Sequence, residues 1–335
     1  MNIDTVDWNT LERLRSEFLA AKGNTGVYWK SPSDLAHYQR FFAARIGWKW
    51  DAALLQARQA GWQLQSRRLL DWGCGSGIAT LRFLDTFGTD CLDEVVLWDH
   101  STLACEFARN AILERHPQIA VSIANPSSLD SLDDTICLIS HVLNELSLDA
   151  RAELTELACS AKQVFWVEPG SHLSSRLLLN QREAMLERFH PIAPCVCAKA
   201  CPMRNDDNLR HWCHFFAKTP MEAFMDGDWA QFAKIMEIDL RSLPYSFICM
   251  DAQSLASVPK LDGHSRVLGR PRQFKGYSKV FSCDANGLSD YELQKRDDKP
   301  LWKSIKKGKD GSLYQWTDID SGRIRSGNSA KEKCS

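Results

Sequence analysis

The sequence contains no hydrophobic run of about 18 residues, the length that a membrane-spanning helix requires. Residues 1–7 are acidic and lack both the apolar segment of a secretory signal and the arginines of a transit peptide. The 12 cysteines are spread over 335 residues, without the density of small secreted disulfide-rich domains. These absences predict a cytoplasmic protein with no membrane partner.

Neither sign of charge dominates, because the net charge is −1, but the charges are unevenly distributed. Residues 260–335 carry 17 Lys and Arg against 10 Asp and Glu, which gives this end +7 and the rest of the chain −8. A basic end on an acidic body favours contact with a polyanion at that end. A solvated tail is the alternative explanation.

With 44% hydrophobic residues, the chain can bury one large core with an appended module, or two modest domains. Residues 8–65 are predicted to be helical, and Ser31-Pro32-Ser33-Asp34 is typical of a helix start. From residue 68 onward, apolar strands alternate with helices. The predicted strands are 68–71, 94–99, 120–124, 135–143 and 163–168, and the predicted helices are 77–87, 102–114, 150–161 and 174–188.

This alternation predicts an α/β fold in which helices cover a parallel sheet. Residues 245–250 and 277–283 are predicted to add strands at an antiparallel end of the sheet, and the polar residues after Gly287 to form an extension with little core. The predicted domains are an N-terminal helical region (1–66), a Rossmann-like core (67–189), a cysteine-rich insertion (190–216), the remaining sheet with a basic hairpin (217–288) and a basic extension (289–335).

A glycine-rich turn follows the first predicted strand, in the stretch Leu69-Leu70-Asp71-Trp72-Gly73-Cys74-Gly75-Ser76-Gly77. Glycines let the backbone approach a ligand closely, and the helix start offers free N–H groups. A dinucleotide site of the dehydrogenase type has a Gly-x-Gly-x-x-Gly turn, which this is not. The stretch resembles the first motif of class I S-adenosylmethionine-dependent methyltransferases. The resemblance implies that Asp71 faces the methionine amino group and that Asp99, after the second strand, accepts the ribose hydroxyls.

Polar residues at the ends of the fourth and fifth strands are catalytic candidates, because these strand ends line the crevice of such sheets. They are His141, Asn144, Glu145 and Glu168. Each also has a local explanation, such as a buried core histidine or a turn residue. The Asn/Asp-Pro-Pro-aromatic motif of amino-group methyltransferases is absent, as is a convincing cysteine nucleophile.

Three cysteines lie close together after this core, at Cys195, Cys201 and Cys213. Thiolates at this density typically hold an iron–sulfur cluster or a zinc ion. The fourth ligand of a 4Fe–4S cluster is then Cys197, Cys249 or Cys283. A zinc site with His211 or His214 is the rival, although the two-residue spacing of zinc knuckles is missing, and unliganded thiols are the third interpretation.

Taken together, these motifs resemble the Rsm-twenty-two family of methyltransferase-like proteins, which includes a mitochondrial small-ribosomal-subunit assembly factor. The resemblance spans roughly residues 25 to 290. It rests on Tyr28-Trp29, Tyr38, Ala44-Arg45-Ile46, Trp48-Lys49-Trp50, residues 70–77, His141-Val142-Leu143-Asn144-Glu145-Leu146, Val167-Glu168-Pro169-Gly170, Ala193-Pro194-Cys195, Cys201-Pro202-Met203, Trp212-Cys213-His214-Phe215 and residues 266–287.

The resemblance implies a 4Fe–4S cluster bound by Cys195, Cys201, Cys213 and Cys283, with Cys197 as a bystander. It also implies that the small ribosomal subunit, its RNA or an assembly intermediate is the partner. The spacing between Cys201 and Cys213 varies in the family, which leaves Cys213 the less secure ligand.

A basic stretch precedes Cys283, with no acid between Gly263 and Phe281. Phe274 and Tyr277 are interleaved with its cations, which suits phosphate binding and base stacking. A solvated β-hairpin is the alternative. The predicted RNA-binding residues are Arg266, Arg270, Arg272, Lys275 and Lys279.

The sequence thus predicts an S-adenosylmethionine-binding methyltransferase fold with an iron–sulfur insertion that acts on the small ribosomal subunit. A non-enzymatic assembly factor that uses the fold as an RNA-binding scaffold is the second hypothesis. A zinc-stabilised methyltransferase of another substrate is the third.

Overall fold

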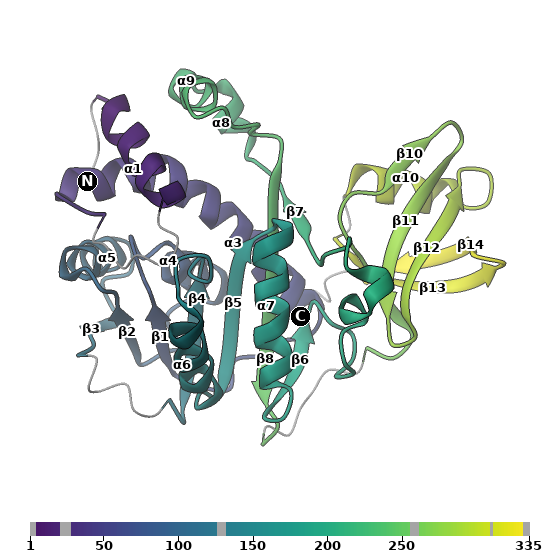
Figure 1. The fold of residues 1–335 in the computed structure, drawn as a ribbon, viewed down its shortest axis with the longest axis horizontal. Helices are drawn as coiled ribbons and strands as arrows, with labels where there is room; N and C mark the ends of the chain where they lie inside the picture. The colour runs from purple at the N-terminus through teal and green to yellow at the C-terminus, as the bar shows by residue number, and fades with distance from the viewer. Residues whose placement is uncertain (1–4, 21–27, 126–131, 255–260, 309–310, 331–335) are drawn as a thin grey trace. The chain divides into compact units, whose positions relative to one another are not determined.

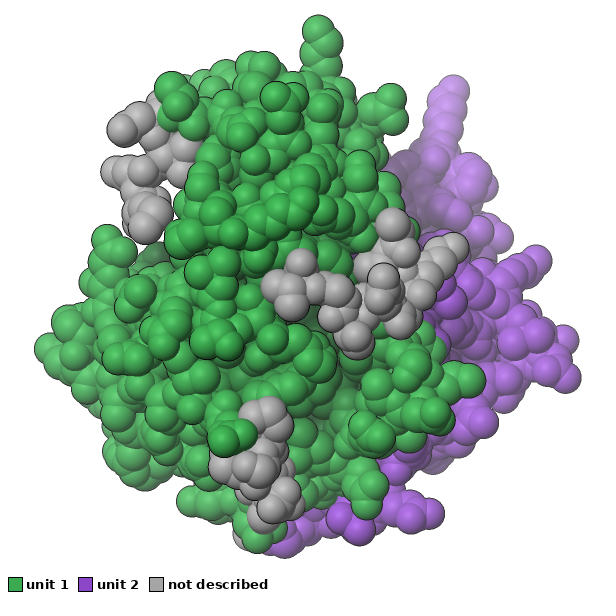
Figure 2. Space-filling view, turned by 60° about the vertical axis from the view of Figure 1, so that its left-hand side comes forward, with its two compact units in different colours: residues 1–52, 64–168, 217–243 green, residues 53–63, 169–216, 244–335 purple. Residues whose placement is uncertain are grey.

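The computed structural model describes residues 5–20, 28–125, 132–254, 261–308 and 311–330. The chain divides into two compact units, coloured in Figure 2. Unit 1 comprises residues 1–52, 64–168 and 217–243, and unit 2 comprises residues 53–63, 169–216 and 244–335. Among the helices of the described residues, none combines the length and the apolar character that crossing a membrane demands.

Unit 1 contains five parallel strands in the order β3-β2-β1-β4-β5 (Figure 1). This confirms the predicted parallel sheet and each of its strands to within three residues. The elements from the first strand to the last are β1 (Arg68–Trp72), α4 (Ile78–Phe87), β2 (Glu94–Trp98), α5 (Thr102–Arg115), β3 (Ala120–Ile123), β4 (Thr135–Ser140), α6 (Leu148–Cys159) and β5 (Gln163–Pro169).

The residues that precede these helices are of types that commonly start a helix. Ser101 and Ser147 cap α5 and α6, where their hydroxyls accept from the N–H groups of Ala104 and Ala150, both at 3.2 Å. Gly77 precedes α4 in the left-handed conformation that only glycine adopts without strain. Each cap places the start of a helix just after the carboxyl end of a strand, where the polar candidates lie.

The N-terminal helices of unit 1 pack through aromatic side chains. They are α1 (Trp8–Ala20), α2 (Pro32–Tyr38), a π-helical turn Gln39–Ala43 and α3 (Ala44–Gln59), and two later helices, α8 (Met221–Met225) and α9 (Gly227–Ile235), complete the unit. Ser31 caps α2 as predicted. Trp50 is fully buried against Phe165, at a ring distance of 5.2 Å, and its indole N–H donates to Ser140 Oγ at 2.9 Å. Trp50 is therefore a packing anchor that holds α3 to β4 and β5.

Unit 2 begins with the end of α3, from Ala53 on, and continues with α7 (His172–Met185). It includes three strands, β6 (Phe189–Ala193), β7 (Phe215–Ala217) and β8 (Leu243–Ala252), of which β6 is antiparallel to β8. Two short 3-10 turns, Pro202–Arg204 and Asp206–Asn208, lie in the cysteine-rich segment. The rest of the unit is a second sheet. Its elements are β9 (His264–Val267), β10 (Arg272–Phe274), β11 (Tyr277–Asp284), β12 (Gly287–Gln294), α10 (Lys299–Lys307), β13 (Leu313–Asp320) and β14 (Arg323–Ser329).

This second sheet closes on itself. Its order is β10-β11-β12-β14-β13-β9, and β9 also pairs with β11, so five strands form a ring to which β10 is added. All its pairs are antiparallel except β12 with β14. A closed ring leaves few unpaired strand edges, which suits a small sheet with its own core.

Two predictions are wrong here. The strand predicted at 277–283 exists, but it belongs to the ring and not to the end of the main sheet, because it pairs with the unpredicted β12 across the turn that ends at Gly287. The extension predicted to have little core is folded. Its apolar residues are sparse but converge in one cluster of Val267, Val280, Leu293, Leu301, Ile305, Tyr314 and Ile324.

We predict that Ile324→Ala destabilises the ring by about 2–5 kcal/mol, because Ile324 is fully buried. Ile319 is its cross-strand partner but is 42% exposed, so Ile319→Ala should cost less than about 0.5 kcal/mol. Hydrogen exchange measured by mass spectrometry on peptides of β11 to β14 reports the local opening free energy. Equal exchange rates in the two variants would show that this region has no core.

Candidate functional site

The glycine turn after β1 is held against β2. The N–H groups of Gly73 and Cys74 both donate to Trp98 O, at 2.8 and 3.0 Å. Gly73, Gly75 and Gly77 have φ values of 71°, 50° and 77°. A Cβ on Gly77 would lie 2.9 Å from the Cβ of Ala108, so this glycine also allows α4 and α5 to pack closely. The turn thus needs its glycines for both conformation and space.

Asp99 joins this turn from the end of β2. One carboxylate oxygen accepts from Gly75 N and the other from Ser101 N, both at 2.9 Å. Burial raises the pKa of Asp99, and these two donors oppose the rise. Each carboxylate oxygen keeps a second lone pair for a ligand.

Asp71 is fully buried at the end of β1, and its Oδ2 accepts from Thr80 N at 3.3 Å and Thr80 Oγ1 at 2.7 Å. Burial raises the pKa of Asp71 to about 6, and the charge of Asp99 adds to the rise. Its other oxygen has no hydrogen-bond partner among the described residues. A buried acceptor without a donor beside a glycine turn fits a ligand that brings a donor.

Glu145 lies in the turn after β4, and the charge of Asp99 contributes to its raised pKa. Burial is the larger cause and brings that pKa to about 6. Tyr28 donates its hydroxyl to Glu145 Oε2 at 3.0 Å, a contact between segments far apart in sequence. Asn144 is exposed in the turn that Glu145 closes by donating its N–H to Val142 O at 2.9 Å.

His141 has a φ of 59° at the end of β4, which is uncommon for a residue with a side chain. Its Nε2 lies 3.2 Å from the Nζ of Lys49, which reaches it from α3. Burial lowers the pKa of both groups, that of Lys49 to about 7. Lys49 is not among the site residues that the sequence motifs indicate. The sequence feature that points to Lys49 is its spacing of four residues from Arg45, which places both basic side chains on one face of α3. Both residues are partly buried.

Glu168 is fully buried at the end of β5, and its hydrogen bonds support the turn that follows β4. Its Oε1 accepts from the N–H groups of Val142 and Leu143, at 3.1 and 3.2 Å, and from the indole of Trp166 at 2.8 Å. Its Oε2 has no partner among the described residues, and burial raises its pKa to about 7. Glu168 therefore positions the turn after β4.

The cysteine-rich segment lies within unit 2. Arg182 of α7 donates from Nε to Cys195 Sγ at 3.2 Å and from Nη2 to Lys199 O at 3.0 Å. Its neighbour Glu183 accepts from Cys201 N at 3.2 Å and forms an ion pair with Arg182. An adjacent pair of opposite charges thus fixes both ends of the loop that carries the first two cysteines.

The four predicted ligands interact electrostatically. The pKa values of Cys201, Cys213 and Cys283 are raised, mainly by burial, and that of Cys201 is about 11. Cys195 contributes to all three increases. Cys283 contributes to the shift of Cys213 as well. The end of β11 lies beside the loop, because Lys199 Nζ donates to Ala285 O at 2.9 Å. In the described ranges, no group of three or more His, Cys, Asp or Glu side chains is arranged around one point as ligands of a single metal ion.

The other candidate ligands have different surroundings. Cys249 is buried on β8. Burial raises the pKa of its thiol, and the charge of Asp251 adds to the increase. The Nε2 of His211 accepts from Arg210 Nε at 3.2 Å, and the Nδ1 of His214 lies 3.1 Å from Trp212 O. Cys197 contributes to the shift of Cys283, so its thiol lies near that residue.

The prediction that Arg266 contacts RNA is wrong, because this side chain is only 2% exposed. Its Nε donates to Pro194 O at 2.8 Å and its Nη1 to Gln56 Oε1 at 3.1 Å. Burial lowers its pKa to about 10, so it remains a cation near the cysteines.

The other four basic residues have varied surroundings. Arg270 lies over the ring of Phe216, at 4.1 Å. Arg272 forms an ion pair with Asp290 of β12, and Lys279 lies 4.0 Å from the same carboxylate. The stretch that lacks acids in sequence is thus partly neutralised in space. Lys275 is exposed in the turn between β10 and β11.

The strand order β3-β2-β1-β4-β5, with a glycine turn after β1 and an acid after β2, defines a class I, Rossmann-like methyltransferase fold. The sequence pattern of the family described as "Mitochondrial small ribosomal subunit Rsm22" matches residues 42–315. The chain belongs to this family.

No curated protein matches the chain. Two solved structures show low similarity to it. The magnesium protoporphyrin IX methyltransferase ChlM from Synechocystis PCC 6803 with bound SAM has 12% identity and a TM-score of 0.40, over 76% of this chain and 100% of ChlM. The plantazolicin methyltransferase BamL has 10% identity and a TM-score of 0.41, over 72% of this chain and 98% of BamL.

We predict that Glu168→Gln is stabilised relative to the unsubstituted protein as the pH rises. Between pH 4.5 and about 7 the folded protein keeps a proton on Glu168 that the unfolded chain releases, so the free energy of unfolding falls across this window. Glutamine keeps the acceptor and has no proton to lose. The difference between the two proteins should therefore grow by about 1–3 kcal/mol from pH 4.5 to 7.5 in denaturant unfolding. Glu153→Gln, at an exposed position on α6, is the control. A difference for Glu168→Gln that does not change with pH would contradict the prediction.

Proposed function

We propose that this protein binds S-adenosylmethionine in unit 1 and acts on the small ribosomal subunit, as its RNA or as an assembly intermediate, in the cytoplasm. The observation that carries the proposal is the meeting of Asp71 and Asp99 at the glycine turn. Asp71 offers a buried oxygen without a partner, and Asp99 is oriented by Gly75 N and Ser101 N. Family membership supports the ribosomal partner.

The residues fit this cofactor in charge and position. Asp99 accepts the two ribose hydroxyls, and Asp71 accepts from the methionine amino group, directly or through water. S-adenosylmethionine, when bound, supplies an electrophilic methyl group. His141, which Lys49 contacts from α3, and Glu168 lie at the ends of β4 and β5, the edge of an open α/β sheet where ligands bind. Their part is to position the acceptor and to take up its proton, and the protein contributes mainly orientation.

We further propose that Cys195, Cys201, Cys213 and Cys283 bind a 4Fe–4S cluster. Arg266 supports a shared site, because it is the register partner of Cys283 and donates to the carbonyl of Pro194, the residue before Cys195. Sulfurs that bind one zinc ion lie about 4 Å apart around a single centre, whereas each cysteine of a 4Fe–4S cluster binds a different iron and the sulfurs lie farther apart. The separate contacts of His211 and His214 disfavour a zinc site of mixed ligands.

A non-enzymatic assembly factor is the second candidate function. Two observations at the end of β4 favour it. Asn144 is exposed. The side-chain nitrogens of Lys49 and His141 contact each other, so they are already engaged and not offered to an acceptor nucleotide. Transfer of labelled methyl groups to immature small-subunit particles separates the two. Methylation that requires Asp99 supports the enzyme, and particle binding without methylation supports the scaffold.

We predict that Asp99→Asn weakens S-adenosylmethionine binding by about 10- to 100-fold, because hydrogen bonds to a charged acceptor contribute about 1.5–3 kcal/mol. Asparagine keeps one acceptor for Gly75 N, so the turn should remain folded. Asp93→Asn is the matched control, since Asp93 lies exposed just before the same strand and pairs with Arg67. Isothermal titration calorimetry measures both. Equal affinities in the two variants would remove Asp99 from the site.

We predict that Cys283→Ser, purified without oxygen, loses iron and most visible absorption near about 400 nm, because a 4Fe–4S cluster needs four thiolates. Cys249→Ser replaces a buried thiol of the same unit that lies outside the proposed set, so it should retain both. Iron content per chain is the readout. Retention of iron by the Cys283 variant would exclude β11 from the ligand set.

A further inference from the structure

The ring of strands in unit 2 has the connectivity of an oligonucleotide-binding barrel. Five strands run along the chain as β9, β11, β12, β13 and β14, and their order around the ring is β9-β11-β12-β14-β13. The third and fifth strands, β12 and β14, are the parallel pair. α10 lies between the third and fourth strands and contributes Leu301 and Ile305 to the barrel core. Barrels of this kind bind oligonucleotides on the face of strands two and three and with the loop between strands one and two.

The second barrel strand presents alternate residues outward. Ser278, Val280 and Ser282 are buried, whereas Tyr277 and Lys279 are partly exposed. The loop between strands one and two contains β10, and its turn places Phe274 opposite Tyr277. Their rings are parallel, with an interplanar angle of 6° and centroids 4.7 Å apart, and Phe274 is 46% exposed. A solvent-exposed parallel aromatic pair is a surface on which an unpaired base can stack.

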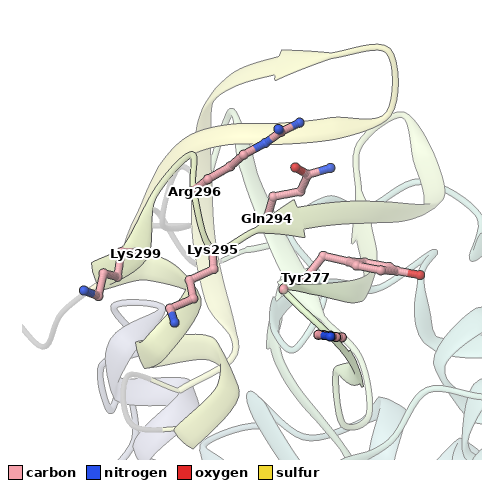
Figure 3. A pocket seen from close by; sticks show the side chains of 7 residues that line it. Tyr277, Gln294, Lys295, Arg296 and Lys299 are labelled. Carbon is pink, nitrogen blue, oxygen red and sulfur yellow. The ribbon is translucent and has the colours of Figure 1, made fainter.

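A pocket of about 630 Å³ lies beside this pair. Its lining comes from the hairpin turn, from the end of β12 and from the start of α10, and consists of Lys275, Gly276, Tyr277, Gln294, Lys295, Arg296 and Lys299. Figure 3 shows Tyr277, Gln294 and Arg296 on one side of the corner after β12 and the ammonium groups of Lys295 and Lys299 on the other. The lining thus holds four cations and no carboxylate.

The nearby acids are already paired, and one of them, Glu292, accepts from the amide nitrogen of Gln294 in the lining. Asp297 binds Arg323 and Arg325, at 2.6 and 3.2 Å, and Asp298 accepts from Leu301 N at 2.8 Å as the cap of α10. Lys295 N donates to Gly276 O at 2.9 Å, which joins the two halves of the lining. None of the four cations forms an ion pair among the described residues, and Lys295 Nζ lies over the ring of Trp302, at 5.7 Å from its centroid. An anionic ligand is therefore the partner that their charge favours.

We propose that this barrel binds single-stranded RNA, with one base stacked on the Phe274–Tyr277 pair, a donor of an adjacent base at Gln294 Oε1, and the backbone phosphates on Lys275, Lys295, Arg296 and Lys299. This inference rests on the proposed ribosomal function and names the element of the chain that holds the RNA. Single-stranded RNA suits the site better than a duplex, because stacking on an exposed ring needs a base that is not paired.

The test measures fluorescence anisotropy of a labelled uridine-rich RNA of about eight nucleotides with the full-length protein. Tyr277→Ala should weaken binding by about 10-fold, whereas Tyr277→Phe, which keeps the ring, should bind as the unsubstituted protein does. Lys295→Glu with Arg296→Glu should lower the dependence of log affinity on log salt by about 1.4, the value for two lost phosphate contacts on a single strand. The matched control is Lys218→Glu with Lys234→Glu, two exposed lysines of unit 1 that change the net charge equally.

Crosslinking with 4-thiouridine RNA on the unsubstituted protein keeps the test independent of variant folding, and the crosslinks should fall in residues 274–277 or 294–299. Wild-type affinity in both pocket variants, crosslinks confined to other segments, or equal affinity for the matching duplex overturns the inference. Each of these results leaves the proposed function standing if the protein still binds RNA. Failure of the unsubstituted protein to bind any small-subunit RNA instead overturns the ribosomal proposal itself.

Discussion

Unit 2 depends on one buried guanidinium. Arg266 of β9 is the register partner of Cys283 on β11, and it donates to the carbonyl of Pro194, the residue before Cys195. Gln56 Oε1 and Ser312 Oγ accept from its Nη1, both at 3.1 Å. Its Nη2 is buried without a hydrogen-bond partner among the described residues, so these three hydrogen bonds compensate the buried charge only in part. Arg266 therefore joins three segments of unit 2. They are the loop that carries Cys195, the strand β11 that carries Cys283, and the end of α3.

This arrangement links the proposed cluster to the proposed RNA site. Cys283 and Tyr277 are six residues apart on the outward side of β11, so about 20 Å of one strand separates them. A cluster bound through Cys283 fixes one end of this strand, while the other end carries the aromatic pair. Lys199 Nζ adds a second link, because it donates to Ala285 O just after β11, at 2.9 Å. The inorganic centre in this account is structural, and its loss would loosen the barrel before it affected unit 1.

The sequence was sufficient where local chemistry decides the structure. Parallel strands such as β4 are continuous apolar runs, so their positions were predictable, and the turn of Gly73, Gly75 and Gly77 needs positive φ values that identify it. The barrel was missed because its strands alternate weakly and bury small polar residues such as Ser278 and Ser282. The Lys49–His141 contact, the burial of Arg266 and the pairing of Arg272 with Asp290 join residues distant in sequence, and no local pattern encodes them.

The central claim is that the four cysteines of unit 2 form the ligand set of an iron–sulfur cluster. The most direct measurement is the content of iron, acid-labile sulfide and zinc in the unsubstituted protein purified without oxygen. The account predicts about four iron atoms and four sulfide ions per chain, with little zinc. One zinc ion per chain without sulfide, or neither metal in a folded protein, would contradict it.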